Sequence, residues 1–507
     1  MAEKKQPSEQ EVFMNKLVAF LQERGFVWGP SPELYGGMAG FYEYGPLGKL
    51  LKNNVENTLR EVFALHEYWE VECPTVMPVA VWQASGHLGN FTDPLVTCSK
   101  CNANFRADKL IEEKVPDVHV AADDYLSFMT EHGIVCPNCK GAFKDEVRRH
   151  NLMMRTTIGL DVEAYNRPET ATTTYLPFPR YFDYFRKKLP FGVYQIGKAY
   201  RNEISPRQLT LRMREFTQAE SQLFIFKDQK EHYEGFERLK DEVLPFWTAK
   251  HQAAGKQPDL TTLASALEHG YLKNKAYAST LALAYKLFTS IAIPPERIRL
   301  RQHADDEKAF YADDAWDIEV KLNSFGWTEM CGIHDRTDYD LKQHGAATKK
   351  ELGVSDETHK KEVPNILEIA FGPDRMVFAI LDLAYNPMDE AEGKTTLHVP
   401  PFLAPIQVQV FPLVKKDGLP EKARAIFEDL VGEFTTAYDE AGSIGRRYLR
   451  AAQQGTPYCL TIDGTTLEDG TVTLRDRDTE KQVRVPISEL SATLHALLKG
   501  KKKFEEL

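Results

Sequence analysis

Charged, aromatic and amide side chains recur along residues 192–224, GVYQIGKAYRNEISPRQLTLRMREFTQAESQLF. The pattern predicts two strands joined by a polar loop that Pro206 interrupts, which is a hairpin with a long tip. Because side chains alternate between the two faces of a strand, Arg201 and Glu203 share one face of the first strand. One face of the second strand carries six polar, charged or aromatic residues: Arg212, Arg214, Phe216, Gln218, Glu220 and Gln222.

This set of side chains suits a ligand that combines phosphates with a flat ring. Guanidinium groups fork onto phosphate oxygens, a phenylalanine stacks on a base, and carboxylates accept hydrogen bonds from amines. ATP has all three features. From the residues alone, the alternative is a ladder of cross-strand ion pairs on a solvated sheet face, which needs no ligand.

The order Arg-x-Glu, loop, Arg-x-x-x-Phe resembles motif 2 of the class II aminoacyl-tRNA synthetases. In that class the first arginine takes the α-phosphate of ATP and the phenylalanine stacks on adenine. The longer string RNEISPR…REFTQAE resembles the glycyl-tRNA synthetase family in particular. The resemblance implies that Phe216, Gln218 and Glu220 contact glycine. It implies ATP contacts from Arg201, Asn202, Glu203, Leu211, Arg212 and Phe216.

A strand-then-helix pattern, PNILEIAFGPDRMVFAILDLAY, covers residues 364–385. Arg375 falls in the first turn of the expected helix, where a cation is electrostatically unfavourable unless an anion lies nearby. The segment resembles motif 3 of the class II enzymes, whose arginine binds the γ-phosphate of ATP. The resemblance therefore gives Arg375 a catalytic role beside Arg201 and places Gly372 at the ATP site.

Three more positions match residues that contact glycine in the family: Glu169, Glu368 and Ala370. From the residues alone, Glu169 in RPETA could equally be a solvent-exposed glutamate at a helix start. The family usually continues with Gln-Gly, where this chain has Thr172 and Thr173, and usually has a small hydroxyl residue in place of Ala370. With Glu220, three glutamates would surround the glycine ammonium, and their repulsion would keep one protonated until glycine arrives.

Residues 316–341, WDIEVKLNSFGWTEMCGIHDRTDYDL, predict a strand, a turn and a second strand. Glu329 and Met330 match a second contact to adenosine in the family. A charged residue on an edge strand would explain Glu329 equally well without the resemblance.

Four of the seven cysteines form two CxxC pairs, Cys98 with Cys101 and Cys136 with Cys139. Four thiolates held in two tight turns suit a tetrahedral zinc ion with no open position, which predicts a structural site. Reduced thiols without a metal are the alternative. Cysteine used in this way fits a reducing compartment, and we expect a cytoplasmic protein. Arg106, in the same segment, matches a family arginine that reaches the active site, and the resemblance implies that it contacts glycine.

The N-terminal part predicts two helices with a turn between them. Residues 10–24 suit a short amphipathic helix, and residues 34–48 a tight turn rich in glycine and tyrosine. Apolar residues at positions 51, 55, 59, 62 and 63 predict a long helix from Leu47 that runs into a strand ended by Pro74. Helix, strand and proline resemble class II motif 1, which forms the dimer interface in that class and implies a homodimer.

Length and charge limit the remaining possibilities. A chain of 507 residues suggests roughly two to four domains. No apolar run reaches the length that spans a bilayer. A net charge of −11 argues against indiscriminate coating of nucleic acid but leaves room for a local groove that binds one RNA. We therefore expect no membrane and no DNA partner.

We expect two domains. Residues 1–400 are the predicted catalytic domain, with a zinc-binding insertion at 96–150 and a helical insertion at 225–300. Residues 401–507 alternate strand and helix patterns, and they resemble the α/β anticodon-binding domain of the glycyl, threonyl, prolyl and histidyl enzymes. Three basic residues there are candidates for contacts with tRNA phosphates: Arg446, Arg447 and Arg450.

The resemblance covers nearly the whole chain and implies an α+β fold, with an antiparallel sheet flanked by helices. It implies ATP-dependent attachment of glycine to the 3′ end of tRNA(Gly) through a glycyl-adenylate, with ATP, Mg2+ and structural Zn2+ as cofactors. Two alternatives stay open: a synthetase for another small amino acid, and an inactive relative that only binds, such as a polymerase processivity subunit. Retention of Arg201, Glu203, Phe216 and Arg375 argues against the inactive relative.

Overall fold

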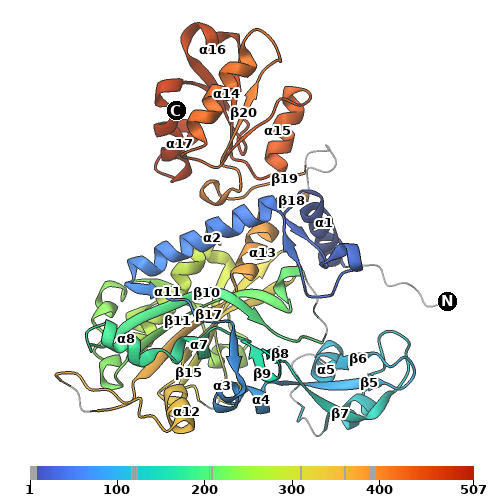
Figure 1. The fold of residues 1–507 in the computed structure, drawn as a ribbon, viewed down its shortest axis with the longest axis vertical. Coiled ribbons are helices and arrows are strands. Elements are labelled where there is room, and N and C mark those ends of the chain that lie inside the picture. Colours follow the sequence, from blue (N-terminus) through green and yellow to red (C-terminus); the bar gives the residue numbers. More distant parts are fainter. Residues whose placement is uncertain are drawn as a thin grey trace.

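The computed structural model describes residues 8–115, 118, 120–121, 124–204, 206, 209–308, 311–358, 361–387 and 395–507. A large domain carries a small insertion on one side and a separate C-terminal domain above it (Figure 1). None of the helices in these ranges combines the length and the apolar character needed to cross a membrane.

A nine-stranded sheet forms the centre of the large domain. Its strands, in spatial order, are β13 (Asp259–Thr262), β12 (Val243–Trp247), β14 (Ile298–Gln302), β15 (Asp314–Leu322), β16 (Gly326–Asp335), β17 (Asn365–Phe371), β11 (Glu215–Ile225), β10 (Phe191–Tyr200) and β3 (Tyr68–Glu70). Neighbouring strands are antiparallel, except that β3 is parallel to β10 and β12 is parallel to β14. The predicted antiparallel sheet of an α+β fold is confirmed.

One face of this sheet holds the main hydrophobic core. Three helices pack on it and on one another: α2 (Pro46–Leu65), α11 (Lys275–Ser290) and α13 (Pro373–Ala384). In α2 the fully buried residues recur at helical spacing: Leu51, Val55, Leu59 and Phe63. The predicted long helix is therefore confirmed, and it is amphipathic because the sheet lies along one side of it.

The opposite face of the sheet is covered at one end only. There, α7 (Ala171–Tyr175) and α8 (Phe178–Tyr184) pack on an aromatic cluster that includes Phe191 and Phe224. Farther along the same face, the middle strands present polar side chains to an open cleft. One face of the sheet thus contacts the apolar core, and the other face presents polar side chains to the cleft.

The predicted hairpin is β10 and β11, paired from Phe191 with Phe224 to Tyr200 with Glu215. Strand pairing ends there, so Arg201, Glu203 and the arginines before β11 lie in the connecting loop and not on strand faces. The alternation argument was therefore correct for β11 from Phe216 onward and wrong for the loop residues.

The N-terminal helix α1 (Glu9–Glu23) matches the predicted amphipathic helix. The turn after it packs against the hairpin loop. The carbonyl of Gly40 accepts a hydrogen bond from the backbone N–H of Arg214, 2.8 Å away. At this positive-φ glycine a Cβ would lie 2.8 Å from Pro206, so a side chain would push the two loops apart.

The predicted strand after α2 is interrupted. Its first part is β3, at the edge of the central sheet, and its second part is β4 (Val76–Pro78). The second part pairs instead with β9 (Val162–Asn166), which in turn pairs with β8 (Met154–Ile158). Pro74, the predicted end of the strand, lies between the two parts.

The insertion that follows has its own small core. β5 (Thr92–Cys98) lies between β6 (Asn104–Arg106) and β7 (Phe143–Asn151). The helices α5 (Ala107–Lys114) and α6 (Tyr125–Glu131) cover this three-stranded sheet.

The helical insertion predicted over 225–300 needs correction. Three strands of the central sheet lie within it, β12, β13 and β14, beside the short helices α9 (Ala249–Ala253) and α10 (Leu263–Glu268). Its long helix, α11, belongs to the main core. The charged residues of this segment suggested helices that stand in solvent. They instead occupy the exposed side of strands and helices whose other side is buried.

The C-terminal domain is a five-stranded sheet with helices, as predicted. Its strands are β21 (Thr436–Tyr438), β20 (Val408–Pro412), β22 (Tyr458–Ile462), β23 (Thr471–Asp476) and β24 (Gln482–Pro486), in spatial order. The helices are α14 (Leu419–Leu430), α15 (Ile444–Gln453), α16 (Gly464–Asp469) and α17 (Leu490–Leu498). Its core is separate from that of the large domain.

Candidate active site

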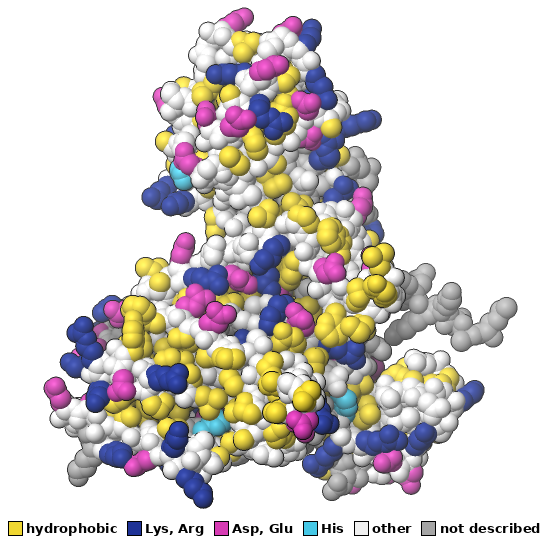
Figure 2. Space-filling view, viewed as in Figure 1, with side chains coloured by type: hydrophobic (Ala, Val, Ile, Leu, Met, Phe, Trp, Pro, Cys, Tyr) yellow, Lys and Arg dark blue, Asp and Glu magenta, His cyan; other side chains and the backbone are white. Residues whose placement is uncertain are grey.

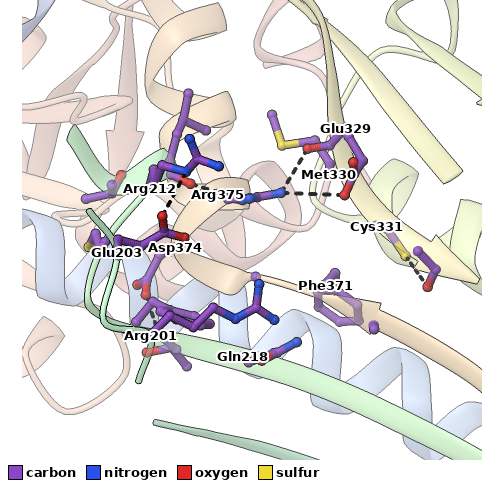
Figure 3. A pocket seen from close by; sticks show the side chains of 18 of the residues that line it. Arg201, Glu203, Arg212, Gln218, Glu329, Met330, Cys331, Phe371, Asp374 and Arg375 are labelled. Atoms are coloured by element: carbon purple, nitrogen blue, oxygen red, sulfur yellow. Dashed lines mark hydrogen bonds and ion pairs between the residues drawn. The ribbon is translucent and has the colours of Figure 1, made fainter. Parts of the chain in front are cut away.

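The open face of the central sheet holds a cleft of about 240 Å³ (Figure 3). β11, β16 and β17 form its floor, and the hairpin loop and the start of α13 form one wall. Most of the predicted ATP contacts line it: Arg201, Glu203, Leu211, Arg212, Phe216, Glu329, Met330, Gly372 and Arg375. Two of the predicted glycine contacts besides Phe216 also line it: Gln218 and Ala370.

Arg201 is held between two aromatic rings. Its guanidinium carbon lies 5.3 Å from the ring centre of Phe91 and 5.4 Å from that of Phe216. Nε donates to the carbonyl of Pro168 at 3.0 Å. These contacts fix the side chain without supplying a carboxylate, so its positive charge is available to a ligand.

Arg375 lies in the first turn of α13, as predicted. Its Nε donates to the carbonyl of Leu211 at 3.1 Å, and NH1 donates to the carbonyl of Glu329 at 3.2 Å. Burial lowers the pKa of Arg375, and the charges of Arg201 and Arg212 lower it further, against the opposing effect of Glu329. Arg212 lies 3.5 Å from Glu203, and Arg375 lies 3.9 Å from Glu329. Three neighbouring arginines beside two carboxylates favour a polyanionic ligand.

A buried ion pair ties α13 to the hairpin. Asp374 accepts from Lys52 Nζ at 2.5 Å, from Tyr44 Oη at 2.8 Å and from the backbone N–H of Thr217 at 2.5 Å. This carboxylate therefore fixes the start of α13, and with it Arg375, against β11. Sequence analysis missed both Lys52 and Asp374, because the partners lie 322 positions apart.

Glu220 is buried on β11, and within the described residues its Oε2 has no hydrogen-bond partner. Burial raises the pKa of Glu220 well above its usual value, and the nearby charges of Glu169 and Glu368 raise it further. The three glutamates thus come close enough to repel one another. A buried, unpartnered carboxyl of this kind suits a small cation.

Glu169 is partly buried just before α7, not solvent-exposed at a helix start. Its Oε1 accepts from Thr172 Oγ1 at 2.8 Å and lies 3.4 Å from His87 Nε2. Burial acts to raise the pKa of Glu169, but His87, Arg336 and the hydrogen bond from Thr172 together outweigh it, and the net shift is downward. Thr172, which departs from the family's usual residue, thus orients this carboxylate directly.

Thr173, the second residue that departs from the family's usual pair, forms hydrogen bonds with residues next to the three glutamates. Thr173 Oγ1 accepts from Arg167 NH1 at 3.3 Å and from Gln195 Nε2 at 3.2 Å, and it donates to the carbonyl of Thr170 at 2.8 Å. Both threonines therefore have hydrogen-bonding roles in this chain.

Glu368 is the most constrained of the three glutamates. Oε2 accepts from Tyr175 Oη at 2.6 Å, and Oε1 lies 3.2 Å from His334 Nδ1 and 3.3 Å from Arg336 NH1. Burial acts to raise the pKa of Glu368, but Arg336 and His334 outweigh it and lower it. Sequence analysis missed His334, which lines the cleft beside Ala370.

Five predicted contacts lie outside the cleft lining: the three glutamates Glu169, Glu220 and Glu368, together with Arg106 and Asn202. Arg106 pairs with Asp93 at 3.1 Å and with Asp108 at 2.5 Å. It is near enough to Glu203 for that carboxylate to help raise its pKa, so it borders the ATP end of the site. Asn202 donates its backbone N–H to Leu152 and is bound through its carbonyl by His150 Nε2 at 3.0 Å.

The four cysteines of the insertion form one cluster. The sulfurs of Cys98, Cys101, Cys136 and Cys139 all lie within 4.8 Å of one another. The Sγ atoms of Cys98 and Cys139 are 3.5 Å apart, and those of Cys101 and Cys136 are 3.6 Å apart. Four sulfur donors at these separations fit a tetrahedral zinc ion with every position filled.

The candidate tRNA arginines on α15 differ in their surroundings. Arg447 is buried and donates to the carbonyls of Pro412, Leu413 and Gly442, so its predicted phosphate contact is not supported. Arg450 pairs with Asp439 at 2.5 Å and stays partly exposed. Arg446 is exposed on the same helix.

Both domains match models of known protein families. The family model for the tRNA synthetase class II core domain (G, H, P, S and T) matches residues 161–384, and that for the anticodon binding domain matches residues 407–497. The solved structure of Giardia lamblia prolyl-tRNA synthetase in complex with prolyl-adenylate has a TM-score of 0.60 at 15% identity, covering 95% of this chain and 75% of that chain. At this identity, the likeness shows the fold.

Other proteins that match along nearly the whole chain have a higher sequence identity than this solved structure. The glycine–tRNA ligase of Methanocaldococcus jannaschii is 38% identical over 584 residues, covering 97% of this chain and 100% of that protein. The glycine–tRNA ligase of Thermococcus kodakarensis is 39% identical, covering 94% of this chain and 97% of that protein. Identity of this degree over nearly the whole length shows that the chain belongs to the glycine–tRNA ligase family of class II aminoacyl-tRNA synthetases.

Proposed function

We propose residue roles for the reaction that family membership gives this enzyme, the ATP-dependent attachment of glycine to tRNA. The carboxylate of glycine attacks the α-phosphorus of ATP and releases pyrophosphate. The glycyl group of the resulting adenylate then passes to the terminal ribose 3′-hydroxyl of tRNA. The observation that carries these roles is an arginine-lined cleft that reaches Ala370, whose strand neighbour Glu220 lies buried beside Glu169 and Glu368.

The arginine end would bind ATP. Arg201 would hold the α-phosphate, Phe216 would stack on adenine, and Arg375 would hold the γ-phosphate. No protein nucleophile is needed, since positioning and neutralisation of phosphate charge account for catalysis. Glu203 and Glu329 are carboxylates at this end that would hold Mg2+, which supplies further positive charge to the phosphates when ATP is bound.

The glutamate end would bind glycine. Glu220 has the unpartnered oxygen, so it is the best placed to accept from the ammonium group. Glu169 and Glu368, each already oriented by donors, would add negative charge around the ammonium. Larger amino acids would be excluded by size, because a closed pocket can reject a longer side chain sterically.

The insertion and the C-terminal domain would support the reaction from outside the cleft. The four cysteines would hold a structural Zn2+. The exposed Arg446 and the partly exposed Arg450 remain candidates for tRNA phosphates. A cytoplasmic location remains our expectation from the cysteine usage.

A homodimer is supported by the exposed apolar residues at the β3 edge of the central sheet. The exposed fractions are 81% for Leu65, 54% for Trp69 and 65% for Tyr184. Figure 2 shows hydrophobic side chains gathered over this part of the face, where Figure 1 places α8. A second copy seated there would cover them, and Trp69→Glu should then convert dimer to monomer in analytical ultracentrifugation.

ATP–pyrophosphate exchange with a panel of amino acids tests the proposal. We expect exchange with glycine and at most weak exchange with alanine or serine. Stronger exchange with alanine or serine would identify an enzyme for another small amino acid on the same scaffold. Exchange with no amino acid would identify an inactive relative.

A further inference from the structure

His334 stands on β16 at the glycine end of the cleft, beside Ala370 and Gly332. Its Nδ1 lies 3.2 Å from Oε1 of Glu368. Because the carboxylate can only accept, it keeps the hydrogen of the neutral imidazole on Nδ1, and in that form Nε2 is an acceptor. Within the described residues, Nε2 has no hydrogen-bond partner.

The backbone beside the imidazole leaves it room. A Cβ built on Gly332 would lie 2.8 Å from Cε1 of His334 and 3.7 Å from Oδ1 of Asp317. Residue 332 can therefore carry no side chain while His334 keeps its position. The resulting gap over Gly332 has His334 on one side and Asp317 of β15 on the other.

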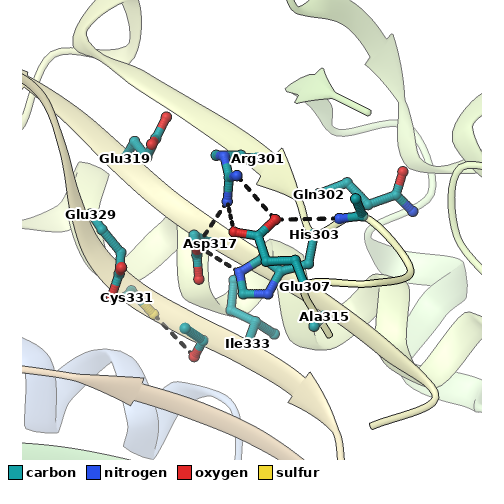
Figure 4. Close-up of polar contacts among 12 residues, drawn as sticks. Arg301, Gln302, His303, Glu307, Ala315, Asp317, Glu319, Glu329, Cys331 and Ile333 are labelled. Atoms are coloured by element: carbon teal, nitrogen blue, oxygen red, sulfur yellow. Dashed lines mark hydrogen bonds and ion pairs between the residues drawn. The ribbon is translucent and has the colours of Figure 1, made fainter. Parts of the chain in front are cut away.

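A second polar cluster surrounds Asp317 on the neighbouring strand β15 (Figure 4). His303 Nε2 lies 2.7 Å from Oδ2 of Asp317, and Arg301 forms a fork with Glu307 at 2.8 and 3.0 Å. The rings of His303 and His334 are 6.3 Å apart, centre to centre. Asp317 is thus already paired, whereas His334 presents a free acceptor.

The second step of the reaction needs such an acceptor, because the attacking ribose hydroxyl must lose its proton. Among the described residues that line the cleft, His334 is the only one with an imidazole. Cys331 donates to the carbonyl of Gly332 at 3.6 Å, and burial raises its pKa well above the usual range, so it stays a thiol. Asp374 is already bound by Lys52.

We propose that His334 is the general base of glycyl transfer, an inference that rests on the function proposed above. The 3′-hydroxyl oxygen of the terminal ribose, seated over Gly332, bonds to the carbonyl carbon of glycyl-adenylate. The bond from that carbon to the phosphate oxygen breaks, and AMP leaves with the electron pair. The hydroxyl proton passes to Nε2, and Glu368 stabilises the imidazolium through Nδ1–H.

The charges around His334 come from four elements. Glu368 of β17 and Arg336 after β16 lie on its Nδ1 side. Asp317 of β15 and His303 after β14 lie across the gap. Burial acts to lower the pKa of His303, but its contact with Asp317 outweighs burial and raises it. Asp317 is therefore already paired with His303, and Glu368 is the carboxylate directly bonded to the proposed base.

Rapid-quench transfer from preformed enzyme-bound glycyl-adenylate to tRNA tests the proposal. In His334→Gln, which keeps a polar side chain but cannot act as a base, we expect the transfer rate to fall about 100-fold or more. ATP–pyrophosphate exchange by the same variant should stay close to the wild-type rate, because the proposed base acts only in the second step. Replacement of the neighbouring imidazole, His303→Gln, is the matched control. It should change the transfer rate by less than about threefold.

Other outcomes would overturn the proposal. Transfer within threefold of wild type in His334→Gln would remove the residue from catalysis. Equal losses of ATP–pyrophosphate exchange and transfer, or a raised glycine KM with normal transfer, would make His334 a positioning residue for Glu368. Failure of the wild-type enzyme to form the adenylate would instead contradict the function proposed above.

Discussion

The two ends of the cleft hold charge in opposite ways. At the ATP end, Arg201 and Arg375 donate mainly to backbone carbonyls, so their positive charges stand ready in the empty site. At the glycine end, Glu220 is buried, lacks a partner for one oxygen among the described residues, and has a raised pKa.

The difference follows from the chemistry of the groups. A guanidinium stays charged at any ordinary pH, so a phosphate site built from arginines must leave them partly solvated or held by neutral dipoles. A carboxyl can take up a proton, so three glutamates can lie together by keeping one neutral. The central claim is therefore that the arginines of the ATP end are charged before ATP binds. Glu220 at the glycine end is instead protonated until the ammonium group of glycine binds.

The largest effect is expected when charge is removed from the ATP end. Arg201→Ala or Arg375→Ala should lower the rate of glycine-dependent ATP–pyrophosphate exchange about 100-fold, or about 3 kcal/mol, because phosphate charge is left uncompensated. Lys198→Ala, which removes an exposed cation from the same hairpin, is the control and should keep near-normal exchange. A loss of less than tenfold in an arginine variant would remove that arginine from its role.

Removal of the unpartnered carboxyl at the other end should separate the two substrates. Glu220→Gln should raise the glycine KM about tenfold or more, since a charge-assisted contact is lost, and leave the ATP KM nearly unchanged. Exchange measured against each substrate in turn checks this. If the variant disturbs ATP and leaves glycine alone, Glu220 belongs to the nucleotide site.

A substitution in the zinc-binding insertion should lower the stability of the protein more than it affects either end of the cleft. Cys136→Ser should abolish stoichiometric zinc and lower Tm by about 5 °C, because a four-thiolate site would no longer close. Metal analysis and thermal unfolding measure this. Cys73→Ser, at a cysteine outside the cluster, should keep the metal. Wild-type protein purified without zinc would disprove the site.

The smallest effect concerns the hydroxyl that the family usually has. Ala370 pairs with Glu220 on one neighbouring strand and with Gly332 on the other, within the cleft lining. Ala370→Ser should lower the glycine KM severalfold, since one neutral hydrogen bond contributes about 1 kcal/mol. Ala370→Val, which adds bulk without a hydroxyl, should raise it. A serine variant with unchanged or weaker glycine binding would show that the glutamates alone orient the substrate.

Local patterns in the sequence were enough to predict part of the site. Strand periodicity placed Phe216, Gln218 and Glu220 on one face, and helical periodicity placed Arg375 in the first turn of its helix. The resemblance to the class II motifs, not geometry, assigned Arg375 to the same site. Each periodicity needs only the geometry of one element. The paired CxxC turns were informative for the same reason, because their spacing already fixes two ligands each.

Contacts between distant segments were not predictable in this way. Lys52 and Asp374 meet only because α2 and α13 pack together, and His334 matters only because Gly332 leaves it space. The surface charges of 225–300 hid its strands, which are short and join a sheet whose other strands come from distant segments. Arg447 looked like its exposed neighbour Arg446, and only the fold shows that it satisfies buried carbonyls.

Proton release on glycine binding tests the central claim most directly. The pKa of Glu220 is raised in the empty site, so the carboxyl is protonated below that pKa, and the arriving ammonium should drive its ionisation. Calorimetric titration over a series of pH values, in buffers of different ionisation enthalpy, should show proton release on glycine binding at pH values below that raised pKa. The release should fade as the pH rises through that pKa and be absent in Glu220→Gln. Glycine binding without proton release at every pH of the series, or equal release by the variant, would contradict the claim.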